Sequence, residues 1–391
     1  MTTTNVVRKR SNRVQSGLRF QFDYWLLLAI GGLLVIGMLT VYSTTFDIGM
    51  RWQDDANYYI RRQFIALLIG LAGFFVVMQC DYLILRMRYL SVLMLLGTLA
   101  LLIAILFFGE SSLGAVRGLQ GGSYQPSEIA KLTMILYIAH WLSTKGDRIK
   151  SATYGLIPFS IITAVVCALV VLEPDLSTAA LIALISFTVF FVAGADWRQF
   201  AAVGVLGGAT FLLLIFALPH SAARWDAFVS SFSDPVNASY QMGHTLAALA
   251  RGGITGVGLG ASSQKYVLPA AHTDGAFAIW AEEAGLLGGL LVIGLLAMLA
   301  WRGLRAASRA RDTYGALLAI GITCWLSYQA LLNMAVITAV IPFTGIPLPF
   351  ISYGGSSLAV SLVGAGILLN VSRDAAVTQR VQPQKAGRGQ A

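Results

Sequence analysis

The chain has 391 residues, of which 57% are hydrophobic and only 12% are charged, and its mean hydropathy is +0.73. Soluble globular domains carry about 25% charged residues, so this composition excludes an ordinary soluble protein and indicates a polytopic membrane protein. The net charge of +9 at pH 7 does not indicate nucleic-acid binding, because most cations lie in short segments between apolar runs, where they mark topology.

The N-terminal tail, residues 1–23, is basic and polar, and the apolar run after it is too long for a signal peptide and lacks a cleavage pattern. Apolar runs that can cross a bilayer, roughly 20 residues each, recur about ten times. We place them at 24–44, 62–80, 89–108, 128–143, 154–172, 177–195, 199–219, 276–301, 314–340 and 355–371. The expected fold is an all-α polytopic membrane domain of about ten transmembrane helices over 24–371. The tail at 372–391 lacks an apolar pattern and is expected to be disordered.

The distribution of Lys and Arg predicts the orientation. A cytoplasmic N-terminus places 19 of the 27 cations on the inner side and seven on the outer side. This asymmetry follows the positive-inside rule, and an even number of spans leaves both termini in the cytoplasm. Cys80, Cys167 and Cys324 all lie in expected spans and are odd in number, which argues against a disulfide framework.

Two outer loops are too long to be simple connectors. The first covers 109–127, and the second, between the seventh and eighth spans, covers 220–275. Long loops with structure of their own usually carry function. Within the second, apolar residues at helical spacing from Tyr240 to Arg251, followed by Gly252 and Gly253, predict a short helix.

The fourth span begins with two opposite charges. Glu128 and Lys131 are three residues apart and share a helix face, so they can neutralise each other. Pro126 and Ser127 indicate a helix start, which places the pair near the outer surface. The pair is either a structural ion pair or part of a cavity lining.

Four further acidic residues lie near expected helix ends. Glu173 and Asp175 form a hairpin between two spans, where Asp175 can simply cap the sixth helix. Glu282 and Glu283 follow Asp274 at a depth of about 12 Å along the eighth span. Neither can face lipid cheaply, so we expect both to contact other helices.

The glycine-rich stretch at 252–285 ends the second outer loop. Its segment GVGLGASS resembles a dinucleotide fingerprint only weakly, because no strand precedes it. Glycine backbone can approach phosphates closely and Lys265 can add a countercharge, although a flexible turn explains the glycines equally well. Asp274 lies where this loop meets the next apolar run. No His, Cys and carboxylate set has zinc spacing, so any metal would be a hard cation.

Residues 346–358, IPLPFISYGGSSL, combine a Pro-rich turn with small residues that open the last span. They either pack and cap helices or form a wall of a cavity for lipid tails or sugars. Asn333, midway along the ninth span, is either a helix–helix hydrogen-bond group or a cavity group.

Together, QPSEIAKL, EPDLSTA, GLGASSQKYVLPAAHTD, AEEAG and IPFTGIPLPFISYGGSSL resemble motifs of the SEDS family (shape, elongation, division and sporulation) of membrane peptidoglycan glycosyltransferases. Two of these motifs, GLGASSQKYVLPAAHTD and IPFTGIPLPFISYGGSSL, look closer to FtsW and its sporulation relative SpoVE than to RodA. The chain departs from the family at Gly275 and Ala276 after the HTD motif, at Ala270 where the family usually has Glu, and at Gly118 where it often has Trp.

The resemblance implies a ten-span enzyme of the bacterial cytoplasmic (inner) membrane, both termini inside, that polymerises lipid II at the outer face for cell division or cell shape. It implies that Asp274 is essential, and the chemistry suits a general base that accepts a proton during inverting displacement of undecaprenyl pyrophosphate. The candidate substrate-binding residues are Arg117, Glu128, Lys131, Arg224, Gln264, Lys265, His272, Ser356 and Ser357. A divalent cation, Mg²⁺ or Mn²⁺, is a possible cofactor. The implied partners are a class B penicillin-binding protein with transpeptidase activity and other divisome or elongasome membrane proteins.

Two alternatives come from other classes of protein. A transporter that flips lipid II would suit a polytopic bundle with charges inside the membrane, although the polar clustering lies at the outer side rather than at the midplane. A non-catalytic division scaffold would explain the spans but not the charged residues within them.

Overall fold

The computed structural model describes residues 23–386 except 109, 113–114, 119–124 and 234–239. Its longer helices are α1 (Tyr24–Gln53), α2 (Tyr58–Gln79), α3 (Arg88–Phe108), α4 (Pro126–Ser143), α5 (Ile157–Leu172), α6 (Leu176–Val192), α7 (Trp197–Ala217), α10 (Ala276–Ser308), α11 (Thr313–Ile337) and α12 (Gly355–Ala386). Shorter elements are α8 (Pro219–Ser233), α9 (Tyr240–Gly252), η1 (Tyr82–Arg86), η2 (Gly146–Lys150), η3 (Ala152–Leu156), η5 (Gln264–Tyr266), β1 (Glu110–Ser112) and β2 (Ala115–Gly118).

The helical membrane fold expected from composition is confirmed. Eight of the described helices are long and apolar enough to cross a bilayer. α6 is a shorter apolar helix of 17 residues, and α4 carries the charges of Glu128 and Lys131. Every expected span therefore has a helix, and a total of ten crossings stays a prediction.

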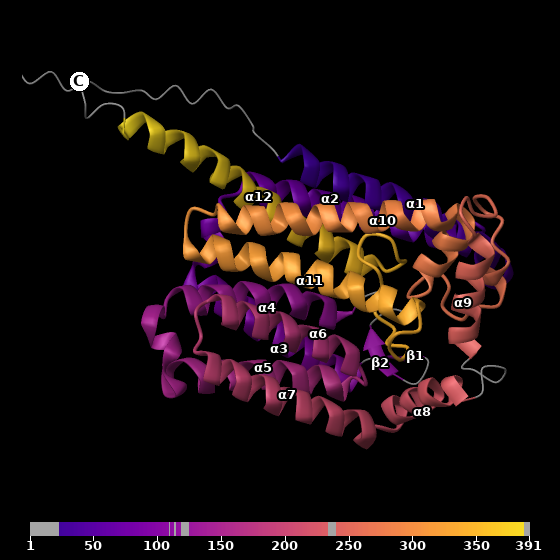
Figure 1. Ribbon diagram of the computed structural model, residues 1–391, viewed down its shortest axis with the longest axis horizontal. Coiled ribbons are helices and arrows are strands. Elements are labelled where there is room, and N and C mark those ends of the chain that lie inside the picture. Colours follow the sequence, from indigo (N-terminus) through magenta and orange to yellow (C-terminus); the bar gives the residue numbers. More distant parts are fainter. Residues whose placement is uncertain (1–22, 109, 113–114, 119–124, 234–239, 387–391) are drawn as a thin grey trace, which may run out of the picture.

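The long helices lie side by side, and the short elements α8, α9, β1 and β2 gather at one end of the bundle (Figure 1). α11 lies deep within the bundle, with Trp325 and Leu326 fully buried, whereas α7 leaves nearly all of its side chains exposed. In a bilayer those exposed apolar side chains face lipid.

Aspartates begin several helices, since a short acidic side chain accepts hydrogen bonds from the free amides of the first turn. Asp175 accepts from the backbone N of Thr178 over 3.1 Å, which confirms the capping interpretation of the hairpin. Asp23 caps α1 in the same way and also pairs with Arg302 of α10 over 2.5 Å. That pair joins α1 and α10 at the end where α10 finishes.

Three segments bear on the expectations for loops and tails. The helix predicted at Tyr240–Arg251 is present as α9. The first outer loop contains the antiparallel hairpin β1–β2, a small exception to the all-helical expectation. The C-terminal segment, expected to be disordered from 372, continues as α12 to Ala386, while residues 1–22 of the N-terminal tail lie outside the described part.

Candidate functional site

Helix α10 is broken at Gly285, and the glycine-rich segment 252–258 passes through the break. Gly285 has φ 67° and ψ −167°, so two carbonyls before it and two amides after it lose their helical partners. The segment supplies all four replacements. The bonds run from Val257 N to Glu282 O, from Gly258 N to Glu283 O, from Leu286 N to Gly253 O and from Leu287 N to Ile254 O, over 2.9–3.2 Å. The break therefore leaves none of these backbone groups unsatisfied, as membrane depth requires.

Two glycines make this crossing sterically possible. A Cβ added to Gly256 would lie 2.1 Å from the carbonyl oxygen of Glu283, and one added to Gly285 would lie 2.3 Å from the nitrogen of Gly256. Both residues also have positive φ, which disfavours other residues. The glycines of GVGLGASS were open to interpretation as a phosphate loop or a flexible turn, and the structure gives the first of them, Gly256, a packing role.

The chain between the two halves of the crossing, residues 259–281, is called here the outer lobe. Glu282 at its base is fully buried and holds it in place. Its carboxylate accepts from the hydroxyls of Ser262 and Ser263 and from the backbone N of Gln264, and it pairs with Arg251 over 3.2 Å. Glu282 thus contacts the lobe and α9, not lipid.

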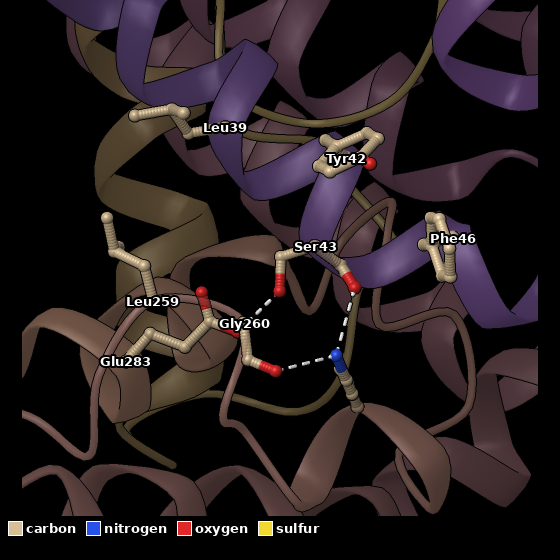
Figure 2. Close-up of a pocket in the computed structure, with 8 residues that line it drawn as sticks. Leu39, Tyr42, Ser43, Phe46, Leu259, Gly260 and Glu283 are labelled. Atoms are coloured by element: carbon tan, nitrogen blue, oxygen red, sulfur yellow. Dashed lines mark hydrogen bonds between the residues drawn. The ribbon is translucent and has the colours of Figure 1, made fainter. Parts of the chain in front are cut away.

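A groove of about 390 Å³ separates α1 from the outer lobe (Figure 2). Ser43 of α1 donates to Glu283 over 2.5 Å across it. Lys265 donates to Ser43 O over 3.3 Å and to Gly260 O over 2.9 Å, and its Nζ lies 3.7 Å from the carboxylate of Asp47. Lys265 is only 9% exposed, so its charge is already balanced by protein groups.

Asp274 lies at the end of the outer lobe, just before α10, and is 8% exposed. The residue that begins α10 in the N-cap position is Gly275 rather than Asp274. One carboxylate oxygen of Asp274 accepts from the hydroxyl of Thr273 over 2.9 Å. A Cβ placed on Gly345 would lie 3.6 Å from the other, so the carboxylate lies against the turn that precedes α12.

That turn, residues 344–347, is the point at which several elements meet. Ser177 of α6 donates to Thr344 O over 2.9 Å, and Arg224 of α8 donates to the same oxygen over 3.4 Å. From α11, Asn333 donates to Ile346 O and Gln329 donates to Pro347 O, over 2.8 and 2.9 Å. The turn thus brings α6, α8 and α11 to Asp274.

The predicted ion pair at the start of α4 is present and buried. Nζ of Lys131 lies 2.8 Å from Glu128 Oε1 and 2.8 Å from Gln329 Oε1, and its charge lies 5.4 Å from the ring of Trp325. Oε2 of Glu128 is buried, and no hydrogen-bond donor to it lies within the described part of the chain. Gln329 connects this pair to the 344–347 turn.

His272 packs beside two tyrosine rings that also contact each other. The centroids of Tyr59 and Tyr353 lie 6.0 and 5.6 Å from its own, and Tyr353 N donates to His272 O over 2.8 Å. Burial lowers the pKa of His272 to about 4, so the ring is neutral at pH 7. Burial also raises the pKa of Tyr353.

The remaining predicted residues lie in different places. Ser356 accepts from Gln125 N over 3.2 Å, which joins the start of α12 to the start of α4. Ser357 is buried beside it, and Gln264 bonds Nδ1 of His244 over 2.7 Å, which joins the outer lobe to α9. Arg117 is part of β2, and its side chain lies outside the described part.

Six of the ten predicted residues therefore form two groups. Glu128, Lys131, Arg224 and Asp274 connect to the 344–347 turn, whereas Gln264 and Lys265 anchor the outer lobe to α9 and α1. Sequence reasoning missed Gln329 as a connecting group. An amide four residues before Asn333 on an otherwise apolar helix was the available signal, since polar residues at this depth need partners.

Within the described ranges, no three His, Cys, Asp or Glu side chains come together as a group that could hold a metal ion. Mg²⁺ often binds through one or two carboxylates and the phosphates of its substrate, an arrangement that needs no such group.

Known proteins are similar to this chain in sequence. Residues 24–377 match the FtsW/RodA/SpoVE family model, which is described as cell cycle protein. Stage V sporulation protein E of Bacillus subtilis (strain 168) is 37% identical over 349 residues, covering 87% of this chain and 94% of that protein. The probable peptidoglycan glycosyltransferase FtsW of Geobacter metallireducens is 36% identical over 357 residues, covering 90% of this chain and 95% of the relative.

Solved structures resemble the fold over nearly the whole chain. A chain from a peptidoglycan synthase complex that coordinates polymerization and crosslinking superposes with a TM-score of 0.71 and 26% identity, covering 91% of this chain and 98% of that one. The rod shape determining protein RodA of Thermus thermophilus superposes with a TM-score of 0.66 and 25% identity, covering 91% of this chain and 98% of RodA.

Proposed function

The chain belongs to the FtsW/RodA/SpoVE family and is a membrane peptidoglycan glycosyltransferase, and we propose that it polymerises lipid II with Asp274 as general base. The observation that carries the proposal is the position of Asp274, a buried carboxylate that lies against the 344–347 turn just before the start of α10.

The reaction needs one bond to form as another breaks. The 4-hydroxyl of one GlcNAc attacks the anomeric carbon of a MurNAc, the bond to undecaprenyl pyrophosphate breaks, and the α-linked donor becomes a β-linkage. A single inversion of this kind needs a base for the hydroxyl proton and positive charge beside the leaving diphosphate.

Asp274 supplies the base in this proposal. A carboxylate with little exposure to water competes well for a proton from a neighbouring hydroxyl, and the Thr273 hydroxyl orients one of its oxygens. The other role open to a short acidic side chain just before an apolar helical run is a helix cap, and the N-cap position of α10 belongs to Gly275.

Arg224 is the best placed cation for the diphosphate. Its side chain is exposed and reaches the 344–347 turn, beside which Asp274 lies. The charge of Lys131 is buried against Glu128, and that of Lys265 is balanced beside Asp47 of α1. Arg224 therefore approaches the donor from α8 in our proposal.

The proposal includes the environment of the enzyme. The protein spans the membrane several times, and we place it in the bacterial cytoplasmic membrane with both termini inside, in accordance with the cation asymmetry. A class B penicillin-binding protein is the proposed partner, because a similar chain belongs to a complex that coordinates polymerization with crosslinking. A bound Mg²⁺ or Mn²⁺ ion would be held chiefly by the diphosphate.

Purified full-length protein in liposomes with fluorescent lipid II tests the function. We expect glycan chains from the wild-type protein and none from Asp274→Asn. Movement of labelled lipid II between leaflets without chain formation would favour the transporter alternative. No product and no movement, with the partner present, would favour the scaffold.

A further inference from the structure

We propose that Asn333 is a positioning residue that sets the place of Asp274 through the polypeptide backbone. The inference rests on the proposed function of Asp274 as the base. Asn333 lies on α11, and its side chain contacts the main chain of Asp274 at the carbonyl oxygen.

The side-chain amide of Asn333 joins three elements. It is 1% exposed near the C-terminal end of α11, and its Nδ2 lies 2.8 Å from the carbonyl oxygen of Asp274. The same nitrogen lies 2.8 Å from the carbonyl oxygen of Ile346 in the 344–347 turn. Because an amide nitrogen has two hydrogens, each carbonyl receives one. The two backbone segments on either side of the Asp274 carboxylate are thus fixed to one point on α11.

Gln329 repeats the arrangement one helical turn earlier. Its Nε2 donates to Pro347 O over 2.9 Å, while its Oε1 accepts from Lys131 and from the indole of Trp325, each over 2.8 Å. Residues four apart lie on one face of a helix. The same face of α11 therefore holds the turn at two successive carbonyls, and Asn333 is the member that also reaches Asp274.

A purely stabilising role explains Asn333 less well. Its Oδ1 is buried, and no described group donates to it, which makes the amide a costly choice for packing alone. An apolar side chain of the same size would avoid that cost. The two N–H donors of Nδ2 are the feature that a leucine could not replace, and they bond the backbone carbonyls of Asp274 and Ile346.

The test compares variants of the full-length protein in the lipid II polymerisation assay. Asn333→Leu keeps the number and branching of the side-chain heavy atoms, adds the bulk of two methyl groups and removes both donors. Thr323→Val on the same helix is the matched control, because Thr323 is also buried but donates to Ala319 O of its own helix. Asn333→Gln keeps an amide but displaces it by one methylene.

Since a displacement of about 1 Å can cost roughly 100-fold in rate, we expect Asn333→Leu to lower kcat by about 10- to 100-fold, with KM for lipid II within about threefold of wild type. Thr323→Val should stay within about twofold in both, and Asn333→Gln should fall between Leu and wild type. Activity is normalised to the monodisperse folded fraction, so that lost protein does not count as lost kcat.

Wild-type kcat in folded Asn333→Leu overturns the inference, and so does an equal loss in Thr323→Val. If Asn333→Leu does not fold, Asn333→Gln decides, and a wild-type kcat there also overturns it. Failure of the proposed function is distinguishable, because then the wild-type protein makes no glycan or Asp274→Asn makes as much as wild type.

Discussion

Nζ of Lys131 lies 2.8 Å from Oε1 of Gln329, a residue 198 positions later in the chain. This bond joins the start of α4 to α11 and gives the buried ammonium group of Lys131 a second acceptor besides Glu128. Lys131 and Glu128 neutralise each other, so each depends on the other for its burial.

The first prediction concerns this pair. Lys131→Met should cost about 3–5 kcal/mol, because it leaves Glu128 as a buried charge without its cation. Glu128→Gln combined with Lys131→Met should recover much of that loss, since no unpaired charge remains. Thermal unfolding in detergent measures both, and a double variant less stable than Lys131→Met would contradict the prediction.

The second prediction is for Asp274→Asn. The amide has the size of the carboxylate but cannot accept the proton of the attacking hydroxyl at neutral pH. We expect glycan synthesis to fall by roughly 10²–10⁴-fold while melting temperature and membrane insertion stay near wild type. Near wild-type polymerisation by a well-folded variant would rule out the general base.

The third prediction concerns the crossing at the α10 break. Gly256→Ala places a Cβ 2.1 Å from the carbonyl of Glu283, so the segment cannot pass and we expect little folded protein. Gly260→Ala is the matched control, because it also has positive φ but nothing lies within 4 Å of its added Cβ. The control should lose only about 1–2 kcal/mol. Detergent-soluble, monodisperse protein is the measurement, and equal yields of the two variants would contradict the packing role.

The fourth prediction is a pH dependence of stability. The pKa of His272 is about 4 in the folded protein, and about 6.5 is the usual value for an unfolded chain. Between these values the unfolded chain binds more protons, so the free energy of unfolding falls as pH falls from about 6.5 to about 4. The contribution is at most about 1.4 kcal/mol per pH unit and levels off below about pH 4.

His272→Phe should remove this contribution. The variant's melting temperature should therefore change less between pH 7 and pH 5 than that of wild type. The carboxylates of the chain contribute equally to the pH dependence of both proteins. If the melting temperatures of the two proteins change by the same amount across this range, His272 titrates in the folded protein as it does in the unfolded chain.

The fifth prediction is topology. Ala261 is exposed in the outer lobe, and Ser308 is exposed at the C-terminal end of α10. In a background without Cys80, Cys167 and Cys324, a thiol probe that cannot cross membranes should label Ala261→Cys in intact cells and spare Ser308→Cys. The reverse pattern would invert the orientation.

Much of the architecture was predictable because hydropathy, helix caps and i,i+3 spacing act locally. The spans, the helix at Tyr240, the cap at Asp175 and the pairing of Glu128 with Lys131 all follow from residues a few positions apart. These features need no knowledge of how the helices pack.

Contacts between distant segments were not predictable in the same way. Lys265 was assigned to substrate from its position after a glycine-rich stretch, but its protein partners include Ser43, more than 200 positions earlier. The break at Gly285 likewise depends on backbone from 252–258 arriving at one place. A local pattern gives the composition of such a segment, while its partners are set by the packing of whole helices.

The crossing at the α10 break also has a consequence for how this protein can vary. The outer lobe leaves the membrane bundle at 252–258 and returns at 282–287, and the two stretches are bonded to each other. Its two ends are therefore fixed at one shared junction, much as an inserted module is attached to its host. An insertion or deletion between the two stretches would leave this junction in place, while the contacts that the lobe makes with α1 and α11 would still have to be matched by those helices.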